Sequence, residues 1–188
     1  MARMAADAFL ANASRFIDST KWQGMPSPIT PSFFGEMIVS ATEICFAIEL
    51  YLKALWLSVD LAPPETHNLT QIYEPFPYPQ LKEAIESGYR KRMSKLAGAK
   101  AVGLHIKISA AKPGSSEPAK LDFPETLEEV LAYCRDGFVT WRYLYEAVDI
   151  GESRFFDFPI GPLQAIAETL KNLQIRRQYS DGRLGDWI

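Results

Sequence analysis

One stretch of apolar residues at helical spacing, residues 30–59, constrains the fold of this chain more than any other feature. Along it, apolar positions recur at alternating intervals of four and three residues, which is the repeat of one face of an α-helix. These positions are Phe34, Ile38, Ala41, Cys45, Ile48, Leu52, Leu55 and Val59. Other apolar residues lie around the rest of the helix, so we expect several neighbours to bury it. The stretch predicts a central helix about 40 Å long, at about 1.5 Å per residue.

The ends of this helix are also marked in the sequence. Thr30 suits the N-cap position and Pro31 the first helical position, while Pro63 and Pro64 prevent the helix from continuing. Charged residues interrupt every window long enough to span a membrane; they are Glu36, Glu43, Glu49 and Lys53. We therefore expect a helix in the core of a bundle and no membrane span.

Residues 124–149 repeat the same spacing and predict a second long helix. Its apolar positions are Leu127, Leu131, Cys134, Phe138, Trp141, Tyr145 and Val148. Because helices with matching apolar faces pack well against each other, we expect this helix to be the partner of the central one.

Shorter helices are predicted at residues 2–18, 66–74, 80–93 and 162–178, separated by prolines and glycines. Between them, the alternation of Leu104, Ile106 and Ile108 fits either a strand or an extended loop. A chain of 188 residues with 47% hydrophobic content can bury a sizeable core. The sequence therefore predicts one all-α domain over residues 1–188, an up-and-down bundle of about five helices with an irregular, loop-rich insert at about 93–122.

The charge of the chain is concentrated around this insert. Residues 89–120 carry eight basic residues and one acid, although the net charge of the whole chain is −3. The basic residues are Arg90, Lys91, Arg92, Lys95, Lys100, Lys107, Lys112 and Lys120, of which the first six form the predicted anion-binding set. Such a segment either binds an anionic partner or is a solvated loop.

Neither a metal nor a cofactor is expected. The two histidines and two cysteines do not have the close spacing of zinc ligands, and there is no glycine-rich phosphate loop. The N-terminal stretch lacks the apolar core of a signal peptide, so we expect a cytoplasmic protein. Cys45 and Cys134 lie at apolar positions, which favours buried free thiols over a disulfide.

Polar residues within the two long helices are the candidate ligand-binding set. Glu49 and Lys53 are four residues apart, in the order that favours a helical ion pair. Arg142 is flanked by aromatic residues, among them Tyr143, and Glu146 follows one turn later. These five residues form either a polar cleft in which a base stacks beside an arginine, or a structural ion pair between Arg142 and a carboxylate.

Three segments together resemble the HEPN superfamily of helical bundles. They are Glu-Leu-Tyr-Leu-Lys-Ala at residues 49–54, Thr-His-Asn-Leu at 66–69 and Trp-Arg-Tyr-Leu-Tyr-Glu at 141–146. The resemblance covers about residues 34–148. It implies an up-and-down bundle that is often a homodimer. The superfamily includes metal-independent ribonucleases of toxin, phage-defence and RNA-processing systems, and non-catalytic partners of proteins such as nucleotidyltransferases.

The chain departs from the ribonuclease members of that superfamily. They carry an arginine and a histidine on one helix, with four to six residues between them. Here Arg142 has no histidine in reach. The resemblance therefore implies a non-catalytic module that binds a nucleotide, RNA or protein partner in a defence or stress system, such as a toxin–antitoxin pair.

Two alternatives stay open. In the first, the chain is a divergent metal-independent ribonuclease in which His67 is the general base and Arg142 stabilises the phosphorane. In the simpler interpretation of His67, its side chain caps or pins the short helix that follows. In the second alternative, an aromatic loop containing Phe155, Phe156 and Phe158 docks a partner protein.

Overall fold

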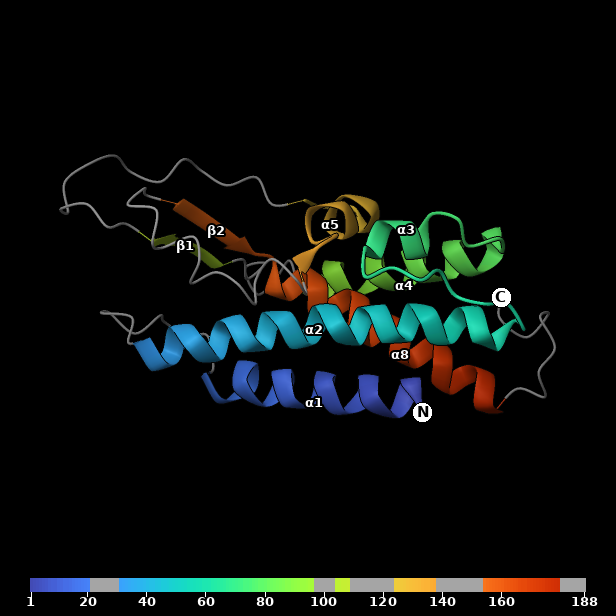
Figure 1. Cartoon of the computed structure of the whole chain (residues 1–188), viewed down its shortest axis with the longest axis horizontal. Helices are drawn as coiled ribbons and strands as arrows, with labels where there is room; N and C mark the ends of the chain where they lie inside the picture. The colour runs from blue at the N-terminus through green and yellow to red at the C-terminus, as the bar shows by residue number, and fades with distance from the viewer. Residues whose placement is uncertain (21–30, 97–103, 109–123, 138–153, 180–188) are drawn as a thin grey trace.

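The computed structural model of the chain describes residues 1–20, 31–96, 104–108, 124–137 and 154–179 (Figure 1). These residues form a bundle of helices with one small two-stranded ribbon. The predicted helical-bundle class is confirmed. None of the helices described is long and apolar enough to cross a membrane.

The central helix of the bundle is α2 (Pro31–Ser58), and it begins at the predicted proline. Its predicted apolar face is buried at Ala41, Cys45, Ile48, Leu52 and Leu55. The helix ends before Pro63 because the backbone turns at residue 60: the N–H groups of residues 60 and 61 donate back to the carbonyls of residues 57 and 56, at 3.2 and 3.1 Å. The central helix is thus confirmed, with an end one residue earlier than predicted.

Helix α1 (Ala2–Thr20) runs antiparallel to α2 and lies beside it (Figure 1). Its small buried residues Ala6 and Ala13 let the two helices approach closely, with Leu10 between them. The rings of Phe9 and Phe46 meet edge to face at 4.8 Å between centroids. This packing explains how a helix with few large apolar residues still contributes to the core.

Helix α8 (Ile160–Tyr179) passes behind α2, and α4 (Pro79–Leu96) packs against α8 (Figure 1). Helix α4 buries Leu81, Ile85 and Tyr89, which are one turn apart from each other along one face. Where α4 meets α8, Gly88 has no side chain: a Cβ there would lie 2.6 Å from Cγ2 of Thr169. The glycine therefore sets how closely these two helices pack.

The short helix α3 (Leu69–Tyr73) begins at Asn68, whose side chain accepts hydrogen bonds from the backbone N–H groups of Thr70 and Gln71. Asn68 is therefore the N-cap of this helix. Its other end is limited by proline: the backbone N–H of Glu74 still bonds to the helix, but Pro75 has no N–H to donate.

The second long helix is not continuous. Helix α5 (Leu127–Tyr133) opens with a capping box between Thr126 and Glu129 and gives way to a turn at residues 134–136. The carbonyl of Arg135 accepts the backbone N–H of Leu69 at 3.1 Å, so this carbonyl is bound to the start of α3. The prediction of one helix through this point is wrong, because the backbone N–H groups of Arg135 and Gly137 bond three residues back, to Ala132 and Cys134, and not four residues back as in an α-helix. Residues 138–149, the rest of that prediction, lie outside the described residues.

The predicted partner of the central helix also changes. Leu127, Leu131 and Cys134 are buried as expected, but α5 packs mainly on α3 and α8. Within the described part of the chain, α1 and α8 are the main neighbours of α2. The apolar periodicity predicted these buried positions correctly, and the described part of the second helix packs mainly on helices other than α2. The pairing predicted for residues 138–149 lies outside the described residues.

The two strands β1 (Leu104–Ile108) and β2 (Arg154–Phe158) pair antiparallel, with Ile106 opposite Phe156. The strand alternative for the insert is therefore correct, and the aromatic segment predicted as a loop is a strand. Its aromatic residues and the branched residues opposite are types that favour paired, extended backbone. That pairing joins two segments about fifty residues apart. The alternation of residues within one strand does not show with which other segment it pairs.

Candidate functional site

A cavity of about 570 Å³ lies between α4 and α8. Three basic side chains of α4, Lys91, Arg92 and Lys95, line it from one face of the helix. The remaining lining residues are mostly small or polar: Gln80, Glu83, Ala84, Ser87, Gly88, Thr169, Asn172 and Leu173. The small residues on α4 leave room for the cavity, and the basic residues in the last turns of α4 give the cavity a positive charge.

A second hollow of about 500 Å³ adjoins the first, because Arg92 and Asn172 line both. It adds Arg15 from α1 and Lys171 from α8, together with the carboxylate of Glu168. We call the two hollows together the basic groove; among the described residues, it is lined by five basic side chains (Arg15, Lys91, Arg92, Lys95 and Lys171) and two acids (Glu83 and Glu168). An excess of three positive charges in a concave surface attracts anions although the chain as a whole is acidic.

The groove contains half of the predicted anion-binding set. Lys91, Arg92 and Lys95 converge on it, whereas Arg90 is exposed and does not line it. Lys100 lies outside the described residues, and Lys107 lies in β1, where the structure describes only the backbone, paired with Phe155. The basic run in the sequence is thus divided by the helix into residues that face the groove and residues that do not.

Arg15 and Lys171 were missed by the sequence analysis. Each is a basic residue beside the buried face of a predicted helix, and such residues are common on any surface helix. Only the packing of α1 and α8 beside the end of α4 places them next to Arg92. Their contribution depends on tertiary structure and has no local signal.

Arg92 is bound to α8 by an ion pair. Its Nη1 atom donates to Oε2 of Glu168 at 2.5 Å, and Nη2 donates to the Glu168 backbone carbonyl at 3.4 Å. The side chains are 28% and 41% exposed, so both remain in contact with water. A pair of this kind orients the guanidinium group without burying its charge.

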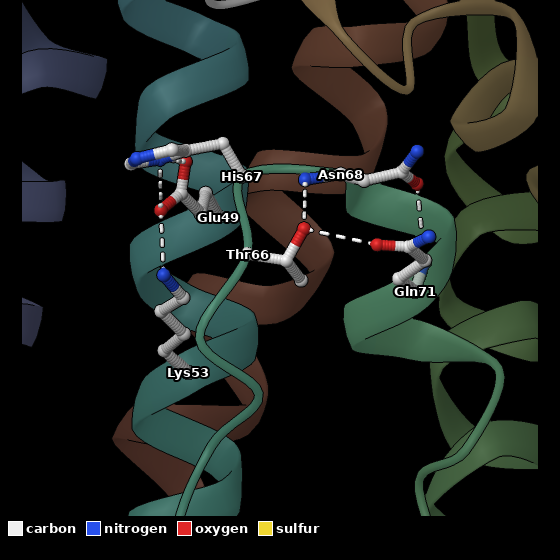
Figure 2. Close-up of polar contacts among 6 residues, drawn as sticks. All are labelled: Glu49, Lys53, Thr66, His67, Asn68 and Gln71. Carbon is white, nitrogen blue, oxygen red and sulfur yellow. Dashed lines mark hydrogen bonds and ion pairs between the residues drawn. The ribbon is translucent and has the colours of Figure 1, made fainter.

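A second polar cluster lies where the loop that leads to α3 passes α2 (Figure 2). Nδ1 of His67 lies 3.0 and 3.1 Å from the two carboxylate oxygens of Glu49, and Nζ of Lys53 lies 2.8 Å from one of them. Glu49 is 2% exposed, whereas the His67 side chain is 58% exposed. The buried carboxylate thus has a partner on its own helix and a partner on the loop that leads to α3.

His67 and its two neighbours in the loop have different roles at the start of α3. The helix cap is Asn68, and Thr66 accepts the backbone N–H of Asn68 at 3.1 Å (Figure 2). His67 instead pins the loop to α2 through Glu49. The contact of His67 with Glu49 agrees with the pinning role in the simpler interpretation, and the N-cap of α3 is Asn68.

The predicted ligand-binding set is only partly described. The structure brings Glu49 and Lys53 together, as the helical spacing predicted, and adds His67. Arg142, Tyr143 and Glu146 lie outside the described residues. The polar cleft predicted around Arg142 therefore stays a prediction.

Both cysteines are buried free thiols, as predicted. Burial raises the pKa of the Cys45 thiol well above its usual value, and a hydrogen bond with Cys134 and the nearby charge of Glu49 act in the same direction. Such a thiol is a poor nucleophile, because the thiolate is the reactive form. Among the residues that the structure describes, no group of three or more side chains is arranged to hold a metal ion.

Comparison of the chain with family models, with curated proteins and with solved structures gave no match. The resemblance to the HEPN superfamily therefore stays a prediction that rests on the three sequence segments.

Proposed function

We propose that this chain is a non-catalytic binding module whose basic groove takes a phosphate-bearing ligand, a nucleotide or RNA. One observation carries the proposal: Lys91, Arg92 and Lys95 line a single cavity between α4 and α8. Phosphate is the common biological anion that matches this set, because guanidinium groups bind it through paired hydrogen bonds and lysines through charge.

The groove also provides neutral groups suited to a phosphate ester. Ser87 and Asn172 line it with a hydroxyl and an amide, which both donate hydrogen bonds. No aromatic side chain lines either hollow among the described residues, so the groove offers no platform on which bases stack. We therefore propose that the contacts are to the phosphates and depend little on base sequence.

The HEPN-like interpretation is part of the same proposal. It is supported by the helical bundle and by the contact that joins two of its sequence segments, His67 of the second with Glu49 of the first. A homodimer, or a complex with a partner protein such as a nucleotidyltransferase in a defence or stress system, is the context that this interpretation implies.

Fluorescence anisotropy tests the groove directly. The probes are a fluorescein-labelled single-stranded RNA of mixed sequence and a fluorescent ATP analogue, each titrated at several salt concentrations. Replacing Lys91 and Lys95 together by Gln removes two phosphate contacts, so the slope of log affinity for RNA against log salt should fall by about 1.4. Affinity for RNA should fall at every salt concentration tested.

Arg90→Gln is the matched control, since Arg90 is a neighbouring basic residue of α4 that does not line the groove. It should leave both the affinity and the salt slope close to those of the wild type. A loss in the control of about half that in the double variant, which removes two charges where the control removes one, would show that total charge, and not the groove, is responsible.

A metal-independent ribonuclease is the second candidate, and one observation favours it. The Glu49 carboxylate holds Nδ1 of His67, as carboxylates hold histidine bases in known active sites. Arg142, its proposed partner, lies outside the described residues. Incubating RNA with the protein in excess chelator tests this candidate: cleavage must occur and must be lost in His67→Ala and in Arg142→Ala. Intact RNA with the wild type rejects it.

A further inference from the structure

Arg92 occupies a special position in the basic groove. It is the one basic residue that lines both hollows, and Asn172 is the other residue that they share. A ligand in either hollow, or one that extends across both, therefore passes its guanidinium group. No other basic side chain of the described residues has this position, since Lys91 and Lys95 line the first hollow and Arg15 and Lys171 the second.

The guanidinium group of Arg92 already binds an oxyanion of its own chain. Nη1 donates to the Glu168 carboxylate at 2.5 Å, and that carboxylate also lines the second hollow. Carboxylates and phosphates present similar pairs of oxygens to arginine. Glu168 thus offers Arg92 the same kind of partner that a ligand phosphate offers.

The ion pair between Arg92 and Glu168 is weak enough for another anion to replace the carboxylate. Both side chains are partly exposed, and ion pairs in contact with water are weak because solvent screens them. Arg92 has a second bond, from Nη2 to the Glu168 backbone carbonyl at 3.4 Å, which does not depend on the carboxylate. When the carboxylate leaves, this bond still holds the guanidinium group at the junction of the two hollows.

From these contacts we infer that Arg92 is the principal phosphate-binding residue of the basic groove and that Glu168 is its built-in competitor. The Glu168 carboxylate occupies Arg92 in the free protein, and a ligand phosphate replaces it on binding. Glu168 thereby sets the affinity of the groove and favours ligands with enough negative charge to displace it. This inference rests on the proposed function and adds the regulation of the same site.

The test uses the full chain and one probe, a fluorescein-labelled single-stranded oligouridine RNA ten nucleotides long, at low salt. Glu168→Gln keeps the size of the side chain and removes the competing charge. Affinity should rise by about two- to fivefold, which is the range that an exposed ion pair contributes. Arg92→Gln should lower affinity.

Removing any acid near an anion site strengthens binding a little, so the control is Glu83→Gln. Glu83 lines the first hollow and forms no ion pair among the described residues. Its removal should raise affinity by less than the removal of Glu168. A double variant separates loss of competition from loss of a nearby negative charge. When Arg92 is already replaced by Gln, Glu168→Gln should raise RNA affinity by no more than Glu83→Gln does, because the arginine for which Glu168 competes is absent. Thermal unfolding of each variant checks that the fold is kept.

The outcomes separate this inference from the proposed function. Binding by the wild type with no gain in Glu168→Gln, or with a loss, overturns the inference and leaves the proposed function standing. A gain that persists in full without Arg92 also overturns it. Binding that is detectable only in Glu168→Gln supports the inference. No binding of this RNA by any variant overturns the inference and the RNA part of the proposed function, whereas the nucleotide part is tested by the fluorescent ATP analogue.

Discussion

Asp60 lies at the end of α2 with a φ of 59°, in the left-handed region that favours glycine. Two backbone hydrogen bonds, from Asp60 to Leu57 and from Leu61 to Trp56, require this conformation. They are the pair of bonds that closes a Schellman motif. The chain thus keeps a residue with a side chain where the backbone geometry is that of a C-terminal glycine.

We predict that Asp60→Gly stabilises the protein by about 0.5–1 kcal/mol, because glycine adopts this φ without steric cost. Urea unfolding at neutral pH measures the change. Asp60→Ala is the control: it removes the same charge from the negative end of the helix but keeps a Cβ. If alanine stabilises as much as glycine, the effect comes from charge and not from the backbone.

The buried carboxylate of Glu49 binds His67 in the loop before α3. Its partners are Lys53 and His67, and the Lys53 side chain is 21% exposed. Removing one partner of a buried carboxylate is costly, because the charge that remains has lost part of its compensation.

We predict that Lys53→Met destabilises the protein by about 1–3 kcal/mol, measured by urea unfolding. Lys95→Met, an exposed lysine near the end of α4, should change the free energy of unfolding by less than about 0.5 kcal/mol. Similar values for the two variants would mean that Lys53 is an ordinary surface residue and that Glu49 is satisfied without it.

At the scale of helices, the contact of α4 with α8 depends on Gly88. A Cβ at this position would lie 2.6 Å from Cγ2 of Thr169, which is 3% exposed and has little room to move. We predict that Gly88→Ala costs about 1–3 kcal/mol, although alanine has the better helix propensity. Thr169→Ser should restore much of this loss in the double variant, since it removes the clashing methyl group.

Gly35 is the matched control for Gly88. It is also a helix glycine, in α2, and a Cβ added there would have no neighbour within 4 Å. Gly35→Ala should stabilise the protein by up to about 1 kcal/mol, measured by the same unfolding experiment. A loss in both variants would show that helix glycines matter here for a reason other than space.

Helix α5 begins with a capping box whose contribution to stability is lost when Glu129 is protonated. The Glu129 carboxylate accepts the backbone N–H of Thr126 and interacts with its hydroxyl, and it accepts the N–H of Glu125 as well. These bonds hold the pKa of Glu129 below its usual value. A carboxyl group with a lowered pKa stabilises the folded state fully above the pKa of the unfolded chain, about 4.3. The stabilisation is lost as the pH falls through the lower pKa of the folded state.

We therefore predict that Glu129→Gln unfolds more easily than the wild type at pH 7 and that the difference shrinks at pH 3. Urea unfolding at both pH values tests this. Glu128→Gln, one residue earlier in the same first turn, lies outside the capping box and should show a smaller difference at pH 7. A constant difference for Glu129→Gln across the pH range would contradict the role of its charge.

At the scale of the whole molecule, sequence reasoning succeeded where the information is local. The start of α2 at Pro31 and its buried face follow from the proline and from the helical spacing, whereas its end follows from the turn at residue 60. At the break after α5, the Arg135 carbonyl accepts a hydrogen bond from Leu69 of α3, and the basic groove includes Arg15 and Lys171 of other helices. Both features involve contacts between distant segments, and no pattern within one segment encodes such contacts.

The same contacts predict how the molecule unfolds. Helix α2 packs on α1, α3 and α8, while α8 also packs on α4 and α5, so the described helices share one core. Losing any one of them exposes apolar surface of at least one neighbour. We therefore predict a single transition in urea, with coincident curves from helical circular dichroism and from tryptophan fluorescence. Gly88→Ala should shift both curves by the same amount. Two separate transitions would show that part of the bundle is an independent unit, and they would contradict the prediction of one domain over residues 1–188.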